Sequence, residues 1–268
     1  MTELITMHTH STFCNHAKDP LGDMVQAAVD AGIAHMAATE HYPIPDELDP
    51  SKRSTMPAER LEAYIDAVRE QQKRDDIDVL LGCELDWLGK DETRALRASD
   101  FDRFDVVLGS IHFVDRWLMV SHKNMSRWKS VDLEAFWNRY VELWCEAAKS
   151  DMPFTVMAHA DVVKKFSPKP EFDLVPLYER MARAAREGGR MVEVNTSGAY
   201  AECAEYYPSP SLLQAFRAEG VACTVGTDAH CKEHIARDIE RAYDYMRAAG
   251  YTQLAVPTRG RGVRMVDL

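Results

Sequence analysis

The residues best suited to chemistry begin in the stretch MHTHSTFCNH, residues 7–16, which holds His8, His10, Cys14 and His16. Because side chains alternate between the two faces of a strand, His8 and His10 point the same way and can bind one metal ion. A nucleophilic Cys14 with His16 as its base is a competing interpretation. The stretch therefore poses a choice between metal binding and thiol chemistry.

Similar residues recur along the chain, each at the end of a short apolar run. Of the ten histidines, six lie at such ends, and His16 follows just after the first of them. The ends read MHTH, TEH, GCELDW, GSIH, MAH, EVNTSG and TDAH, and they carry His8, His10, His41, Glu84, His112, His159, Asn195, Thr196, Asp228 and His230. Imidazole with carboxylate suits zinc, iron or manganese, so the set as a whole predicts a metal site.

The elements that must position these residues alternate between strand and helix. The apolar runs predict strands at Leu4–His10, His35–His41, Val79–Asp86, Val106–Phe113, Phe154–Asp161, Met191–Ser197 and Ala222–His230. Between them, helices are predicted at Leu21–Ala31, Pro57–Lys73, Leu133–Lys149, Val175–Glu187, Ser209–Glu219 and His234–Ala249. Such alternation predicts parallel strands, and seven units favour an α/β barrel whose chemistry collects at the C-terminal strand ends.

Length and composition limit the class of protein. The 268 residues suit one domain spanning 1–268, and no apolar run approaches the roughly 20 residues that a bilayer requires. The six scattered cysteines indicate reduced thiols, and no signal peptide is visible, so we expect a cytoplasmic protein. The net charge of −11 argues against a nucleic-acid or membrane-surface partner.

A family resemblance rests on these motifs. HTHSTFCNHA, TEH, GCELDW, GSIH, AHADVVKKF, EVNTSG and GTDAH, in this order from residue 7 to about residue 235, resemble the polymerase-and-histidinol-phosphatase (PHP) superfamily of metal-dependent phosphoesterases. The HxHxxxxxH opening is typical of the whole superfamily. The stretches FCNHA, KKF, EVNTSG and YPSP favour its histidinol-phosphate phosphatase branch.

The resemblance implies a distorted (β/α)7 TIM-like barrel with three divalent metal ions, whose identity as zinc, iron or manganese stays open. Carried over by position, the first metal would take His8, His10, Glu84 and Asp228. Glu84 would bridge to the second metal, completed by His112 and His159. The third would take His16, His41 and His230, which leaves Cys14 as a bystander.

The reaction expected at such a site is attack on phosphorus by a hydroxide held between two metals. Glu84, Asp228 and His230 are the residues expected to serve catalysis directly. Three divalent ions would change the formal charge from −11 to −5 and make the cleft locally positive, so the acidic chain is compatible with a phosphate substrate.

Candidate phosphate-binding residues follow the strand ends. They are Lys164, Lys165, Asn195, Thr196 and Arg237. For Lys164, Lys165 and Arg237, a solvated surface charge is an equally good interpretation. For Asn195 and Thr196 in NTSG, a turn or helix cap is equally good. The histidinol-phosphatase pattern often has an arginine after the NTSG-like stretch, whereas this chain has Ala199 and Tyr200 there.

The leading interpretation is a phosphomonoesterase that hydrolyses L-histidinol phosphate to L-histidinol and phosphate in histidine biosynthesis. The partner would be a small phosphorylated metabolite, and the oligomeric state is left open. The alternatives are a PHP phosphoesterase for another small phosphorylated metabolite or nucleotide, a non-catalytic metal-stabilised interaction domain, and a metal-dependent amidohydrolase.

Overall fold

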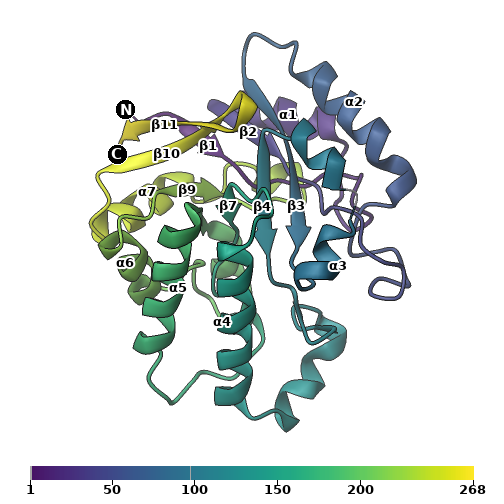
Figure 1. Ribbon diagram of the computed structural model, residues 1–268. Helices are drawn as coiled ribbons and strands as arrows, with labels where there is room; N and C mark the ends of the chain where they lie inside the picture. Colours follow the sequence, from purple (N-terminus) through teal and green to yellow (C-terminus); the bar gives the residue numbers. More distant parts are fainter. Residues whose placement is uncertain (1, 97) are drawn as a thin grey trace.

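The computed structural model describes residues 2–96 and 98–268 and is built on a seven-stranded sheet (Figure 1). The strand order is β1-β2-β3-β4-β7-β8-β9, and every neighbouring pair is parallel. The strands are β1 (Leu4–Thr6), β2 (Ile33–Ala38), β3 (Asp78–Asp86), β4 (Val106–Ser110), β7 (Val156–Met157), β8 (Met191–Asn195) and β9 (Cys223–Gly226). Each overlaps one of the seven predicted runs, so the prediction of a parallel α/β sheet is confirmed.

The first and last strands meet beyond their ladders and close the sheet into a barrel. The Met7 N–H donates to the Val225 carbonyl at 2.8 Å, and the Asp228 N–H donates to the His8 carbonyl at 2.8 Å. The seam of the barrel therefore runs through two of the segments that carry the candidate metal ligands.

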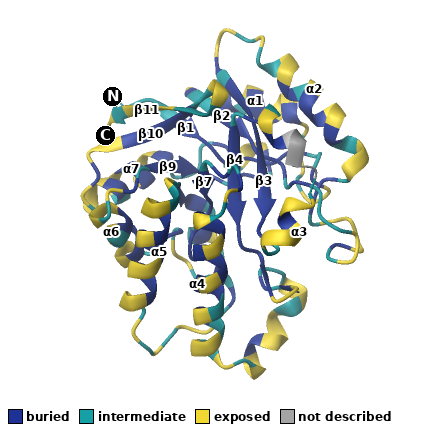
Figure 2. Ribbon diagram, in the orientation of Figure 1, coloured by how far each residue is buried: buried dark blue, intermediate teal, exposed yellow. Residues whose placement is uncertain are grey.

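All six predicted helices are present and pack around the sheet. They are α1 (Leu21–Asp30), α2 (Leu61–Gln71), α4 (Leu133–Lys149), α5 (Val175–Gly188), α6 (Pro210–Ala218) and α7 (Ile239–Ala248), with a short α3 (Lys90–Arg94) in addition. Figure 2 shows their buried faces turned towards the sheet and their exposed faces outwards. In α4 the Asp132 side chain caps the first turn by accepting from the Ala135 N–H, while Trp137, Tyr140 and Trp144 are buried.

Six of the seven predicted strands are too long at their C-terminal ends, whereas β3 runs to its predicted end at Asp86 and contains Glu84. β1 ends at Thr6, and β2 ends at Ala38. His159 and Asp228 have positive φ angles of 23° and 50°, which no regular strand contains. At His159 and Asp228 the backbone therefore leaves the extended conformation at the residues whose side chains enter the candidate site.

Short 3₁₀ segments lie in the connections between the longer elements. They are η1 (Ala58–Arg60), η2 (Ala98–Arg103), η3 (His122–Ser130), η4 (Val162–Lys165), η5 (Thr196–Tyr200), η6 (Lys232–His234) and η7 (Arg259–Arg261). Two antiparallel hairpins, which the sequence did not predict, are β5–β6 (Phe113–Val114 with Trp117–Leu118) and β10–β11 (Gln253–Thr258 with Gly262–Asp267).

The β10–β11 hairpin lies beside β1 and brings the two chain ends together (Figure 1). The Thr2 hydroxyl donates to the Asp267 carbonyl at 3.2 Å. This end of the barrel is opposite the end to which the β3 and β4 arrows point, where the candidate site lies. Within the described ranges, we find no helix that combines the length and the apolar character needed to cross a bilayer.

Candidate metal centre

The side chains of all nine predicted metal ligands come together at the C-terminal ends of the strands. The Glu84 carboxylate, which is 2% exposed, lies at their centre. Its Oε2 atom is 3.2 Å from His8 Nε2 and 2.9 Å from His41 Nδ1, and its Oε1 atom is 2.9 Å from His159 Nε2. The two oxygens of one carboxylate therefore face two different groups of imidazoles, as a bridging ligand requires.

Six of the histidines form three pairs whose Nε2 atoms face each other. The distances are 3.1 Å for His8 with His10, 3.2 Å for His112 with His159, and 2.9 Å for His16 with His230. Two imidazole nitrogens that each lie about 2.0–2.1 Å from one tetrahedral zinc ion are roughly 3.3–3.4 Å apart. The pairs therefore have nearly the spacing of two ligands of one ion.

The hydrogen-bond partners of the third pair, His16 with His230, indicate that both Nε2 atoms can bind a cation. His16 Nδ1 lies 2.9 Å from the Arg53 carbonyl, and His230 Nδ1 lies 2.9 Å from the Asp228 carbonyl. A carbonyl only accepts, so each Nδ1 carries the proton in a neutral ring and each Nε2 presents a lone pair. Two lone pairs 2.9 Å apart repel each other unless a cation lies between them.

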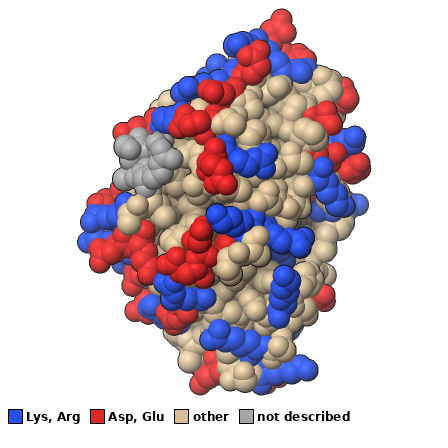
Figure 3. Space-filling view, turned by 90° about the vertical axis from the view of Figure 1, so that its right-hand side faces the viewer, with Lys and Arg blue, Asp and Glu red and all other residues tan. Residues whose placement is uncertain are grey.

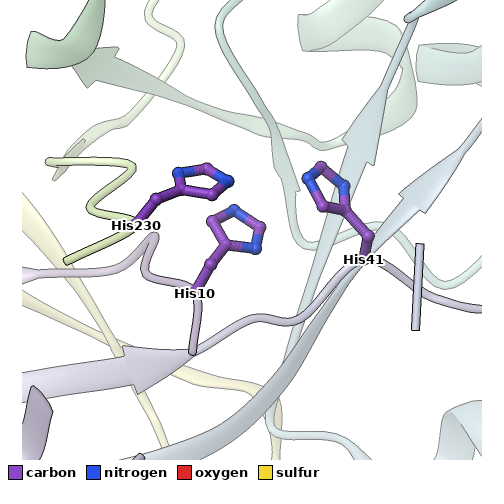
Figure 4. A group of neighbouring side chains, drawn as sticks. All are labelled: His10, His41 and His230. Carbon is purple, nitrogen blue, oxygen red and sulfur yellow. The ribbon is translucent and has the colours of Figure 1, made fainter. Parts of the chain in front are cut away.

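His10 and His41 connect the groups. The His10 ring stacks on His41 with centroids 4.4 Å apart and on His230 with centroids 4.2 Å apart. Figure 4 shows these three rings, which come from three different strand ends, gathered around one space. One donor atom of each lies within 4.8 Å of the others, so His10 reaches both the His8–Asp228 group and the His41–His230 group.

Burial and neighbouring rings keep several imidazoles in the neutral form that binds metals. Burial lowers the pKa of His16 to about 3, with further contributions from His41 and His230. Burial also lowers the pKa of His10 well below its usual value. His8 differs, because burial is outweighed by the carboxylates of Glu193, Asp228 and Glu84, which raise its pKa.

The two predicted carboxylate ligands stay ionised. Burial favours their neutral forms, but nearby imidazoles outweigh it and hold the pKa values of Glu84 and Asp228 well below the usual range. A cluster of anionic oxygens and neutral imidazole nitrogens is the donor set that divalent transition metals prefer.

Two buried acids behind the histidines were not predicted. Glu193 Oε1 lies 3.0 Å from His8 Nδ1 and accepts from the His159 N–H at 2.9 Å. Asp86 Oδ1 lies 3.0 Å from His112 Nδ1. Each acid contacts the Nδ1 atom of its histidine and so orients the ring with Nε2 towards the centre of the site. Carboxylates behind metal-binding histidines commonly have this role. Their positions in GCELDW and EVNTSG, two residues from Glu84 and Asn195, were the available signal.

Glu40 is a third acid that the sequence analysis missed, and it organises the opening loop. Fully buried, it accepts from the Ser11 N–H at 2.7 Å, the Ser11 hydroxyl at 2.5 Å and the Cys14 N–H at 3.1 Å. It thereby fixes the loop between His10 and His16.

Cys14, expected to be a bystander, contacts two members of the site. Its Sγ accepts from the His41 N–H at 3.1 Å and lies 3.7 Å from His10 Nδ1. Burial raises the pKa of this thiol well above its usual value, so the nucleophilic interpretation is disfavoured.

Three of the predicted phosphate-binding side chains are engaged within the protein. Lys164 Nζ lies 3.0 Å from Asp161 and 2.9 Å from Glu205. The Asn195 amide donates to Glu193 at 2.9 Å, and the Thr196 hydroxyl donates to the Arg237 carbonyl at 2.9 Å.

The other two candidates are cations that lie against aromatic rings. Lys165 Nζ is 5.5 Å from the centroid of Phe166, and the Arg237 guanidinium is 3.8 Å from that of Tyr200. Across the described part of the chain, neither has a carboxylate within 4.0 Å, so both remain available to an anion.

Comparison with curated proteins gives relatives over most of the chain. It is 31% identical over 233 residues to a probable histidinol-phosphatase of Deinococcus radiodurans, covering 86% of this chain and 87% of the relative. It is 24% identical over 278 residues to a probable histidinol-phosphatase of Schizosaccharomyces pombe, covering 96% of this chain and 90% of the relative.

Comparison with solved structures supports the same barrel. The histidinol phosphate phosphatase of Lactococcus lactis, solved in complex with zinc, L-histidinol and phosphate, superposes with a TM-score of 0.77 at 19% identity, covering 98% of this chain and 99% of that one. The predicted distorted (β/α)7 barrel is therefore confirmed. The model of the PHP domain family matches residues 6–197, and with the geometry of the site and the curated relatives this shows that the chain belongs to the PHP domain family.

Proposed function

We propose that this protein is a metal-dependent phosphomonoesterase that hydrolyses L-histidinol phosphate to L-histidinol and phosphate. The observation that carries the proposal is the set of three facing Nε2 pairs around the Glu84 carboxylate. The 31% identity to the probable histidinol-phosphatase of D. radiodurans supports the choice of substrate. We further propose that residues 1–268 form one domain and that the enzyme acts in the cytoplasm.

The proposal assigns three divalent ions to the site, with zinc supported by the L. lactis structure. The groups that would hold the first, second and third ion are His8, His10, Glu84 and Asp228; Glu84, His112 and His159; and His16, His41 and His230. When bound, such ions act as Lewis acids towards phosphate oxygens and activate water as a nucleophile.

The chain's own residues prepare this chemistry. The Asp228 side chain is 17% exposed, against 1% for Glu84, so Asp228 is the carboxylate that faces the open side of the site. The Ser197 hydroxyl donates to Asp228 Oδ2 at 3.1 Å, which orients the carboxylate. Asp228 and His230 thus lie on the side from which the phosphate would enter. Glu84 contacts histidines of two groups from the buried side of the site.

One surface segment carries only positive charge although the chain as a whole is acidic. The segment His122–Ser130 carries Lys123, Arg127 and Lys129 and no acidic residue. In Figure 3, Lys and Arg side chains gather along the lower part of the face. Positive charge on the surface of a protein raises the encounter rate of an anionic substrate such as a phosphate ester.

A second candidate substrate, another small phosphorylated metabolite, is favoured by one observation. Ala199 and Tyr200 follow Gly198, where the resemblance leads us to expect an arginine. A pocket that lacks this arginine can differ in the phosphate ester that it accepts from the pockets of histidinol-phosphatases that have it.

The test combines metal analysis of the purified protein with a phosphatase screen. We expect three divalent ions per chain and a kcat/KM for histidinol phosphate well above that for p-nitrophenyl phosphate or sugar phosphates. Chelation and the variant His10→Ala should abolish turnover, while Glu187→Gln, on the exposed face of α5, should leave it unchanged. Equal activity on many phosphoesters would contradict the substrate assignment, and a protein without bound metal would contradict the site.

A further inference from the structure

Arg237 and Tyr200 form a stacked pair beside the metal centre. The guanidinium carbon lies 3.8 Å from the centroid of the Tyr200 ring, close enough for a strong cation–π contact. Tyr200 is also 55% exposed, an unusual position for a large aromatic side chain. The two residues come from different segments, η5 and the stretch between η6 and α7, so the tertiary structure creates the pair.

The backbone that carries Arg237 is fixed to the site by two threonines. The Thr196 hydroxyl donates to the Arg237 carbonyl at 2.9 Å, and the Thr227 hydroxyl donates to the Ile235 carbonyl at 3.2 Å. Thr196 precedes Ser197, the partner of Asp228, and Thr227 precedes Asp228 itself. The base of the arginine is therefore held beside the open side of the candidate metal centre.

The charge of Arg237 is not compensated by the nearest acid. The Asp238 carboxylate accepts from the Tyr200 hydroxyl at 2.9 Å through Oδ2 and pairs with Arg241 at 3.3 Å through Oδ1. Among the residues that the structure describes, no carboxylate lies within 4.0 Å of the Arg237 guanidinium, and its buried Nε has no hydrogen-bond partner. A buried N–H without an acceptor is costly, so the protein itself leaves this guanidinium short of both a counter-charge and a hydrogen bond.

We propose that Arg237 is the receptor for the phosphate group of the substrate and that Tyr200 is the positioning residue that holds its guanidinium ready. This rests on the proposed phosphatase function and deepens it, because it selects one cation among the candidates and gives Tyr200 a role.

The chemistry of the stack fits a tetrahedral oxyanion. A guanidinium has N–H groups at the edge of its own plane, and two of them can donate to two oxygens of one phosphate while the carbon stays over the ring. The hydrogen bond from Tyr200 to Asp238 fixes the ring and engages the acid that would otherwise neutralise Arg237. Lys164, by contrast, is held by Asp161 and Glu205 and has no such freedom.

The test measures binding of inorganic phosphate to the metal-loaded protein by calorimetry, which does not depend on turnover. We expect Arg237→Ala to weaken phosphate binding about 10- to 100-fold, the usual loss for a charge-assisted pair of hydrogen bonds. Tyr200→Ala should weaken it about three- to tenfold, and Tyr200→Phe less, because the ring remains. In the Arg237→Ala background, Tyr200→Ala should have no further effect.

The matched control is Arg217→Ala, which removes a guanidinium that lies 5.9 Å from the Tyr251 ring and already donates to the Gly250 carbonyl. Phosphate affinity should not change in this variant. Metal content and thermal unfolding of each variant identify any that misfold, and Arg237→Lys provides a milder second variant that should bind phosphate with intermediate affinity.

Unchanged phosphate affinity in Arg237→Ala and Arg237→Lys, or no phosphate binding by the wild-type protein, would overturn the proposal. If the losses of phosphate affinity from Arg237→Ala and Tyr200→Ala were additive in the double variant, Tyr200 would not act through Arg237. Failure of the proposed substrate is a separate outcome: the wild-type protein would then bind phosphate through Arg237 without preferring histidinol phosphate.

Discussion

His16 Nε2 and His230 Nε2 lie 2.9 Å apart, although 214 positions separate the two residues in the sequence. Each ring directs its Nδ1 at a backbone carbonyl, so both Nε2 lone pairs face the same point. A cation between them turns a repulsive contact into two coordination bonds. The arrangement of this pair therefore indicates a metal-binding site.

In the metal-free protein, the His16 imidazole should remain neutral far below its ordinary pKa of 6.5. Burial first, and then His41 and His230, lower its pKa to about 3. Since the folded state binds this proton more weakly than the unfolded chain does, the metal-free protein should lose stability as pH falls from about 6.5 towards 3. An NMR titration, with the signal assigned by His16→Gln, checks this; a midpoint near 6.5 would contradict it.

Replacing Glu193 by glutamine should weaken metal binding about 10- to 100-fold, as removal of a carboxylate behind a histidine ligand typically does. The amide supplies no negative charge to His8 Nδ1, and it has only one oxygen for His8, His159 and Asn195. Chelator competition measures the change, with Glu187→Gln as the control. Equal metal affinity in the two variants would show that Glu193 only fills space.

Glu40→Gln should lower the free energy of unfolding by about 2 kcal/mol, because hydrogen bonds to a charged, buried acceptor are lost. The amide nitrogen would also face donors from Ser11 or Cys14. Urea unfolding of the metal-free protein measures this apart from metal binding. The exposed Glu59→Gln is the matched control. A variant as stable as the wild type would mean that the loop holds its shape without this acid.

Gly226→Ala should displace His8 and the Glu193 carboxylate that orients it. A Cβ at this position would overlap the Glu193 carboxylate and His8 Cβ, both of which are fully buried. We expect a large loss of bound metal, measured by elemental analysis. Gly22→Ala in α1, where the nearest atom would be 3.9 Å away, should retain metal and stabilise the helix by up to about 1 kcal/mol. Full metal content in Gly226→Ala would be the contrary result.

The sequence by itself determined the class of fold and the residues brought together. Apolar runs alternating with amphipathic segments predict parallel strands and covering helices, since periodicity is a local property of the chain. The strand ends then have to share one side of the barrel, which is why His8, Glu84 and His159 could be grouped without coordinates.

The tertiary structure decided which atoms face which. Glu193, Asp86 and Glu40 stand within the motifs EVNTSG, GCELDW and TEH, but spacing does not give their roles, which come from contacts with His8, His112 and the opening loop. The same holds for the cations: whether Lys164 is engaged and Arg237 is available depends on acids and rings that sequence spacing does not bring near. Periodicity fixes which way a side chain points from its own element, whereas hydrogen-bond partners between elements depend on how those elements pack.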